Sequence, residues 1–353
     1  MRDFTYLSHT RRILFAPGAR KALGNELDRL GMTHPLIVTT KQRASLVDQL
    51  SDTLAHRDWT LFPEAAMHTP VAVTEEALRR FDACGADGVV SVGGGSTIGL
   101  GKALAGRRGL SHISLPTTYS GSEMTDILGE TEGGRKTTRR APEIRPTTVI
   151  YDVELTLGLP LGISGLSGMN AMAHAIEALY APHANPVTDL MALEAIGVLA
   201  KSLPDLADAL DDVDLRADLF YGSWLCGLCL DAAEMSLHHK ICHTLGGSFD
   251  LPHAEAHAVM LPHALAYNAP AIAPVMARLV PLLGADPARA LYDLSRHLGA
   301  PQSLSDLGMP EDGIAKVAQM ALENPYANPR PLAAGPLTEM LTRAWRGNAP
   351  LYR

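Results

Sequence analysis

Four histidines in the second half of the chain have the spacing of side chains that act together. His239 and His243 are four residues apart, on one face of a helix, and His253 follows ten residues later. Asn170 and His174 repeat the four-residue spacing in an earlier segment. An imidazole can donate a hydrogen bond, transfer a proton near neutral pH or bind a metal ion. A single histidine is more often a packing or surface residue, but three separate segments that each present a histidine beside small residues favour one catalytic site.

A glycine-rich turn in the first half has the composition of a phosphate-binding loop. The run VVSVGGGSTIGLGKALA reads as a buried strand, a glycine turn and a helix. Glycines let the backbone approach a pyrophosphate, and the amides and dipole of a helix start hold its charge. The alternative is a tight turn that binds no ligand, because the run matches neither GxGxxG nor a Walker A loop. The candidate cofactor residues here are Gly93, Gly94, Gly95, Ser96 and Thr97.

A second polar loop follows the next expected strand, in the run LPTTYSGSEMTD. Its side chains are small hydrogen-bond donors that can line a cofactor groove. Two such loops at the carboxyl ends of neighbouring strands are typical of a dinucleotide site. The candidate residues of this loop are Thr117, Thr118, Ser120 and Ser122.

The end of the first long strand bears on the choice of cofactor. Dinucleotide enzymes often place an acid there to bind the adenosine ribose. This chain has Thr40 and then Lys41. Because no acid stands in this run to repel a 2′-phosphate, we expect NADH or NADPH as the cofactor.

The first half alternates short apolar runs with helical stretches. Strands buried on both faces read as continuous apolar runs, and alternating strands and helices predict a mostly parallel, doubly wound, Rossmann-like sheet. We also expect a β-hairpin at the sheet edge over 3–16. The expected strands are 35–40, 87–94, 111–116 and 147–152, and the expected helices are 43–55, 73–83 and 97–107.

The second half is rich in Ala and Leu, with helical periodicity from about 160 to 345 and breaks at prolines such as Pro204, Pro262 and Pro274. We therefore expect an α/β dinucleotide-binding domain over 1–156 and an all-α catalytic domain over 157–353, with a ligand cleft between them. Cys226 and Cys229 form a CxxC within an apolar helical run, and we interpret them as core residues rather than a metal or redox site.

Composition excludes several classes of protein. The formal net charge is −8, which repels nucleic acid and anionic membranes. No apolar run is long enough to span a membrane, and the start of the chain does not read as a signal peptide. These features favour a cytoplasmic protein that binds neither nucleic acid nor membrane.

Four motifs together give the chain a family resemblance. The GGGS turn, the TTxSGSE loop, the AxxHAIEA helix and the HxxxHxLGxxxxxPH segment occur in the order and at the separations of the iron-containing alcohol dehydrogenase superfamily. The resemblance covers essentially the whole chain. It implies the dehydroquinate synthase-like fold of two domains, with the nicotinamide between them, and we expect a homodimer. In that family an Asp and three His bind a divalent metal.

Carried over to this chain, the three metal-binding His positions match His174, His239 and His253, and His243 matches a further active-site histidine. The position of the metal-binding Asp holds Asn170, a neutral and weaker donor. We therefore expect a vestigial site with no catalytic metal.

Within the superfamily the chain most resembles the maleylacetate reductases, through GGRKTTRRAPEIRPTTVIYD and ENPYANPRPL. That resemblance implies reduction of an enedioate double bond by NADH or NADPH without a metal. The dicarboxylate substrate needs cationic and hydrogen-bonding partners. The candidates for that role are Lys136, Arg139, Lys240 and Tyr326.

Three alternatives stay open. A metal-dependent alcohol or polyol dehydrogenase of the same superfamily would need a tightly bound metal, which Asn170 argues against. A catalytically silent cofactor-binding protein would not need both phosphate loops and all four histidines. A lyase of the dehydroquinate synthase branch would rely on a metal and several carboxylates, and the expected site is poor in acids.

Overall fold

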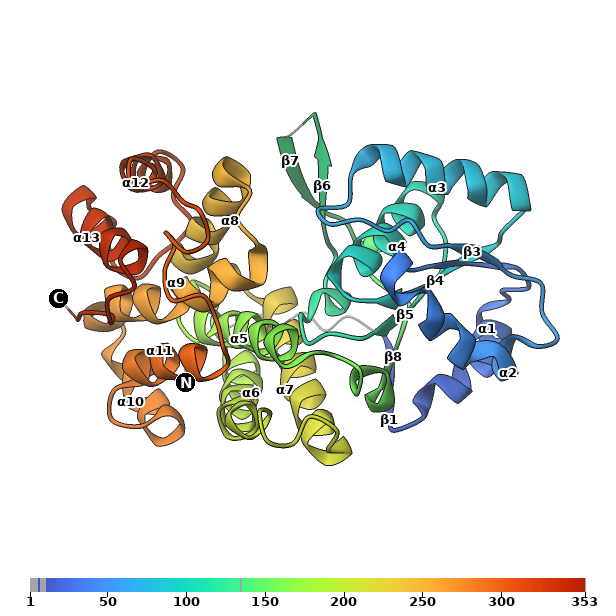
Figure 1. The fold of residues 1–353 in the computed structure, drawn as a ribbon, viewed down its shortest axis with the longest axis horizontal. Helices are drawn as coiled ribbons and strands as arrows, with labels where there is room; N and C mark the ends of the chain where they lie inside the picture. The colour runs from blue at the N-terminus through green and yellow to red at the C-terminus, as the bar shows by residue number, and fades with distance from the viewer. Residues whose placement is uncertain (1–5, 7–10, 134, 353) are drawn as a thin grey trace. The chain divides into compact units, whose positions relative to one another are not determined.

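The computed structural model describes residue 6 and residues 11–133 and 135–352, and its contacts divide the chain into two compact units (Figure 1). The α/β unit contains Ser8–Leu159 and Asp211–Phe220, and the helical unit contains Pro160–Leu210 and Tyr221–Arg353. The first unit therefore includes a segment from the helical half of the sequence, which the periodicity did not indicate.

The α/β unit is built on a six-stranded parallel sheet with the order β1-β8-β5-β4-β2-β3. All four expected strands are present, and two more stand at the edges. The strands are β1 Arg12–Ala16, β2 Pro35–Val38, β3 Thr60–Phe62, β4 Gly88–Gly93, β5 His112–Pro116 and β8 Thr148–Asp152. The hairpin expected over 3–16 is wrong for the described residues, because β1 pairs in parallel with β8. Residues 3–5 and 7–10 lie outside the described part.

Helices cover both faces of this sheet, as expected for a doubly wound fold (Figure 1). Alternate residues of a strand point to opposite faces. Ile37 therefore packs with α1 (Leu23–Leu30), the 3₁₀ segment Lys41–Leu50 and α2 (Ser51–Leu54). Its neighbours Leu36 and Val38 pack on the other face, with α3 (Val71–Cys84) and α4 (Gly95–Arg108).

The strand order places a topological switch point between β2 and β4. The chain runs outward from β2 to β3 and then returns to β4 on the other side of β2. The carboxyl ends of β2 and β4 therefore open onto a crevice, which is where doubly wound sheets bind ligands. Thr40 follows β2 and Gly94 follows β4, so two of the expected cofactor segments lie at this point.

A two-stranded antiparallel hairpin, β6 (Ile127–Glu132) and β7 (Arg135–Arg140), stands outside the main sheet. The sequence did not predict it, because RKTTRR has none of the apolar alternation of a buried strand. Lys136 and Arg139 both lie on β7.

The helical unit packs around α5, whose side chains from Ser164 to Ala178 are buried. A Cβ at Gly168 would lie 2.7 Å from Leu203 Cδ2, so this glycine permits the close approach of α6. From residue 160 onward the described chain has helices and no strand. The helices are α5 Leu161–Ala178, α6 Pro186–Asp205, α7 Val213–Ala232, α8 Leu237–Phe249, α9 His253–Asn268, α10 Ala273–Leu283, α11 Pro287–His297, α12 Gly313–Glu323 and α13 Ala334–Trp345.

Details of this unit confirm one expectation and correct another. Cys226 and Cys229 are buried in α7, and burial raises the pKa of the Cys229 thiol to about 12, so both are core residues. Pro204 and Pro262 do not interrupt the helices as expected, since they lie inside α6 and α9, whereas Pro274 stands at the start of α10. None of the helices in the described residues has the length and apolar character needed to cross a bilayer.

Candidate functional site

Two glycines in the turn after β4 let the backbone pass close to threonine side chains. Gly93 has a φ of +154°, and a Cβ there would lie 2.5 Å from the hydroxyl oxygen of Thr97. A Cβ at Gly94 would lie 2.9 Å from Thr118 Cγ2. At Gly95, the first residue of α4, no atom would come within 4 Å of a Cβ. The start of α4 therefore faces open space, where its amides and dipole favour an anion.

The second polar loop packs against this turn. The Thr117 amide donates to the Gly93 carbonyl at 3.0 Å. The hydroxyls of Thr97 and Ser120 are buried and have no hydrogen-bond partner among the described residues. Buried hydroxyls usually have a hydrogen-bond partner, so we expect a ligand or water to bind these two. The structure thus brings the two expected cofactor loops together.

Lys102, on α4, holds the second loop in place. Its side chain is fully buried, and Nζ donates to the Ser122 carbonyl at 2.6 Å, the Thr125 hydroxyl at 2.9 Å and the Ile127 carbonyl at 3.0 Å. The sequence analysis assigned Lys102 no role. A lysine on the otherwise apolar face of α4 was the signal that it has a buried partner.

An acid lies beside Thr40 after all. Thr40 forms an antiparallel bridge with Glu64, which follows β3, and the Glu64 carboxylate lies 2.8 Å from the Lys41 ammonium. The expectation of an acid-free ribose site considered only the strand that ends at Thr40. The neighbouring strand β3 was not predicted, so its acid was missed.

The helical unit brings the expected histidines into one cluster. α5 contributes Asn170 and His174, and the His174 ring stacks on that of His239 from α8, with centroids 5.0 Å apart. The centroid distances are 6.0 Å from His239 to His243 and 6.4 Å from His243 to His253 on α9. His239 is buried and His243 is exposed, so the two ends of the cluster differ in their access to solvent.

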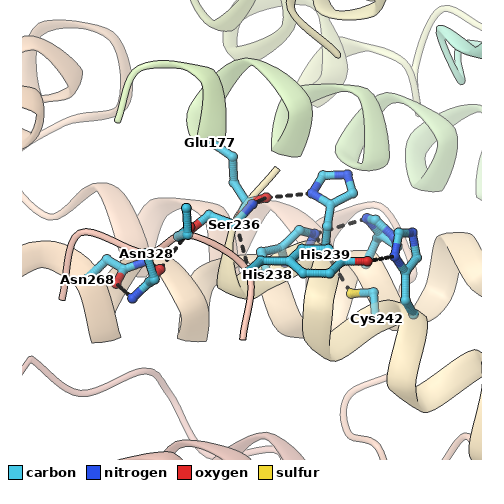
Figure 2. A network of polar contacts seen from close by, with 11 residues as sticks. Glu177, Ser236, His238, His239, Cys242, Asn268 and Asn328 are labelled. Atoms are coloured by element: carbon cyan, nitrogen blue, oxygen red, sulfur yellow. Dashed lines mark hydrogen bonds and ion pairs between the residues drawn. The ribbon is translucent and has the colours of Figure 1, made fainter. Parts of the chain in front are cut away.

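Glu177 anchors the cluster, although sequence reasoning did not select it. Figure 2 shows its side chain reaching from α5 to the start of α8. The carboxylate accepts hydrogen bonds from the backbone amides of Ser236 and His238, both at 2.8 Å, and lies 2.6 Å from Nδ1 of His239. Its contacts are with residues about 60 positions later in the chain, so no local sequence pattern singled it out.

Two further histidines extend the cluster into the core. Nε2 of His238 lies 2.9 Å from Nδ1 of His257, and the Cys242 sulfur lies 3.8 Å from the same Nε2 (Figure 2). Burial lowers the pKa of both imidazoles well below the usual range, so both rings are neutral. The His257 ring lies 4.2 Å from that of His253 and links the core to the site.

Two candidate substrate residues lie beside the exposed end of the cluster. The Tyr326 hydroxyl lies 3.1 Å from Nδ1 of His243, and the Lys240 ammonium lies 5.5 Å from the centroid of the Tyr326 ring. Arg139 is an exposed residue of the α/β unit. Lys136 belongs to the same strand, and its side chain lies outside the described part.

The residues that match the family's metal ligands fit a divalent ion poorly. Ligand atoms around a metal lie about 2 Å from it and therefore within about 4 Å of one another. The ligand atoms of His174, His239 and His253 do not all come within 4.8 Å of one another. Among the described residues that could supply such atoms, only His238, Cys242 and His257 meet this limit, and their own contacts account for it. The fourth position, Asn170, supplies a neutral oxygen.

Two family models match almost the whole chain. "Iron-containing alcohol dehydrogenase" matches residues 10–153, and "Fe-containing alcohol dehydrogenase family, C-terminal" matches residues 165–345. The chain belongs to the iron-containing alcohol dehydrogenase family. This assignment makes it an oxidoreductase and agrees with the α/β unit, the helical unit and the histidine cluster described above.

Individual proteins give a finer comparison. The chain is 48% identical to a maleylacetate reductase from a Rhizobium species, over 99% of this chain and 100% of that protein. It is 46% identical to the maleylacetate reductase of Burkholderia cepacia, over 99% and 100% of the two chains. The crystal structure of the maleylacetate reductase from Agrobacterium tumefaciens superimposes with a TM-score of 0.95, at 49% identity, over 99% of this chain and 100% of that one.

Proposed function

We propose that the chain is a maleylacetate reductase, which reduces the carbon–carbon double bond of maleylacetate to give 3-oxoadipate with NADH or NADPH. Its similarity to maleylacetate reductases along the full length of both chains carries this proposal. The cluster of histidines with a neutral Asn170 in place of an acid also supports it.

The substrate determines what the site must do. Maleylacetate has a ketone conjugated to the double bond, and bound NAD(P)H supplies a hydride to the carbon β to that ketone. Negative charge then develops on the ketone oxygen, and the α carbon must receive a proton. The protein therefore needs hydrogen-bond donors for the oxygen, a proton donor for the carbon and partners for two carboxylates. One well-placed donor to such an oxygen typically contributes roughly 3–4 kcal/mol.

The exposed end of the cluster suits these tasks. We assign charge stabilisation or proton transfer to His243, because it is the exposed ring of α8 and is supported by the Tyr326 hydroxyl at 3.1 Å. Lys240 beside Tyr326 is our candidate partner for a carboxylate. Asn170, His174, His239 and His253 complete the site, and the turn at Gly93–Thr97 with the loop at Thr117–Ser122 would bind the cofactor pyrophosphate.

We further propose that turnover needs no divalent metal, because the donors at the four family positions are neutral and the three histidine donors are too widely spaced. The enzyme would act as a cytoplasmic homodimer, and its mass in solution by light scattering tests the dimer.

The test of the proposed function is oxidation of NADH in the presence of fresh maleylacetate, with identification of the product. One equivalent of 3-oxoadipate per NADH supports the proposal. NADH oxidation with aldehydes or ketones but not with maleylacetate would support an alcohol dehydrogenase instead.

A further inference from the structure

The Glu177 carboxylate is fully buried at the junction of α5 and α8, where it contacts two backbone amides, the His239 ring and Tyr180. Oε1 accepts from the His238 amide, and Oε2 accepts from the Ser236 amide and faces Nδ1 of His239 at 2.6 Å (Figure 2). A backbone N–H can only donate, so both oxygens already act as acceptors. The contact between Oε2 and Nδ1 is then satisfied when the imidazole carries the proton.

We infer that Glu177 is a positioning residue that fixes the tautomer of His239. The proton is on Nδ1, and Nε2 carries a lone pair. A carboxylate behind a histidine commonly sets both the tautomer and the orientation of the ring. Glu177 also binds the two amides at the start of α8, so the ring and the helix that carries it are held by one side chain.

The tautomer of His239 determines what the buried end of the cluster, at His174 and His239, can do. Nε2 of His239 is buried and has no hydrogen-bond partner among the described residues. A neutral His239 therefore presents an acceptor beside His174, whose ring stacks on it at 5.0 Å. His239 then cannot stabilise an oxyanion as a neutral N–H donor, and within the proposed reductase that task falls to the outer part of the cluster around His243. Only this last step rests on the proposed function.

The direct test is the tautomer itself, read in the full-length protein with ¹⁵N-labelled histidine. Long-range ¹H–¹⁵N correlations distinguish a protonated from an unprotonated ring nitrogen, and the spectrum of His239→Ala identifies the His239 signals. We expect Nδ1 of His239 to be protonated and Nε2 to be unprotonated in the wild-type protein. A wild-type ring protonated on Nε2 and bare at Nδ1 would overturn the inference, whatever the enzyme reduces.

Glu177→Leu then removes both acceptor oxygens from behind the ring. Nδ1 loses the partner that holds its proton, so we expect Nε2-protonated rings to appear. Tyr180→Phe is the matched control, because Tyr180 hydrogen-bonds to Glu177 but leaves the carboxylate in place, and it should keep the wild-type tautomer. A Glu177→Leu protein that folds and keeps the proton on Nδ1 alone would contradict the role of Glu177.

Turnover gives the functional readout. Removal of a partner behind a metal-binding histidine typically costs about 10- to 100-fold in activity. We expect a similar loss of kcat in Glu177→Leu with KM for NADH unchanged, and Tyr180→Phe should leave both near wild type. A wild-type enzyme inactive on maleylacetate would sink the proposed function and leave the tautomer assignment intact. An inverted tautomer with a wild-type kcat would show that the lone pair at Nε2 does not matter to the reaction.

Discussion

The Tyr326 hydroxyl lies 3.1 Å from Nδ1 of His243 and joins the segment before α13 to the exposed face of α8. Tyr326 belongs to a segment that resembles maleylacetate reductases, whereas His243 was predicted from helical spacing. Their contact places both residues in one site. It also fixes the ring of the histidine to which we assign a role in the reaction.

His243→Ala should lower kcat by about 10² to 10³ while NADH still binds, because one charge-stabilising or proton-transferring group is lost. Single-turnover hydride transfer, measured beside thermal unfolding, checks this. A packing role would instead give reduced stability and a normal transfer rate in the folded fraction. Tyr326→Phe keeps the ring beside Lys240 and removes only the hydroxyl, so its effect should be smaller than that of His243→Ala.

The remaining histidines of the cluster should behave as one unit with His243. Residues that act together lose function together, so the effects of His239→Ala and His253→Ala should not add to that of His243→Ala. Double variants measured against the single ones test this. Fully additive losses in kcat would show that the rings act separately.

Cofactor choice depends on the end of β2. We expect NADPH to work within about tenfold of NADH, a gap of roughly 1.4 kcal/mol. Thr40→Asp should penalise NADPH, because a second carboxylate would stand near a 2′-phosphate. Glu64→Gln should have the opposite effect, since it removes the existing carboxylate and releases Lys41. Ratios of kcat/KM for the two cofactors decide this, and an unchanged ratio in both variants would move the ribose site elsewhere.

The sequence predicted the centre of the α/β unit better than its edges. Continuous apolar runs such as DGVVSVGG mark strands buried on both faces, so β4 and its neighbours were found. β1 and β3 are edge strands, and β3 has only three residues, which gives too little pattern to recognise. Missing β3 also meant missing the position of Glu64.

The sequence likewise predicted only part of the candidate site. Helical spacing was enough to group His239 with His243 and Asn170 with His174, because those pairs are local. The role of Glu177 depends on α8, which starts 60 residues later along the chain, and no local pattern encodes that contact. The burial of Lys102 likewise follows from the carbonyls that the second loop turns toward it.

Stability should fall on mild acidification because of buried neutral histidines. Burial lowers the pKa of His112 to about 3, compared with about 6.5 in an unfolded chain. The unfolded state therefore binds the extra proton, and the stabilising contribution is complete above pH 6.5 and is lost as the pH falls toward 3. In that window each such histidine lowers the free energy of unfolding by about 1.4 kcal/mol for every unit that the pH falls.

Urea unfolding at pH 7 and pH 5.5 measures this slope. Between pH 6.5 and pH 5.5, the free energy of unfolding of His112→Asn should fall by about 1.4 kcal/mol less than that of the wild type. The exposed His56→Asn is the matched control and should leave the pH dependence unchanged. Equal pH dependence in wild type and His112→Asn would show that His112 is not held neutral by the fold.

We propose that this member of an iron-containing family reduces maleylacetate without a metal. The most direct measurement is the rate of NADH oxidation with maleylacetate after exhaustive chelation, with residual iron and zinc determined on the same sample. We predict an undiminished kcat at metal contents far below one ion per chain. Loss of turnover on chelation, restored by one equivalent of Fe²⁺ or Zn²⁺ and abolished by Asn170→Ala, would contradict the account.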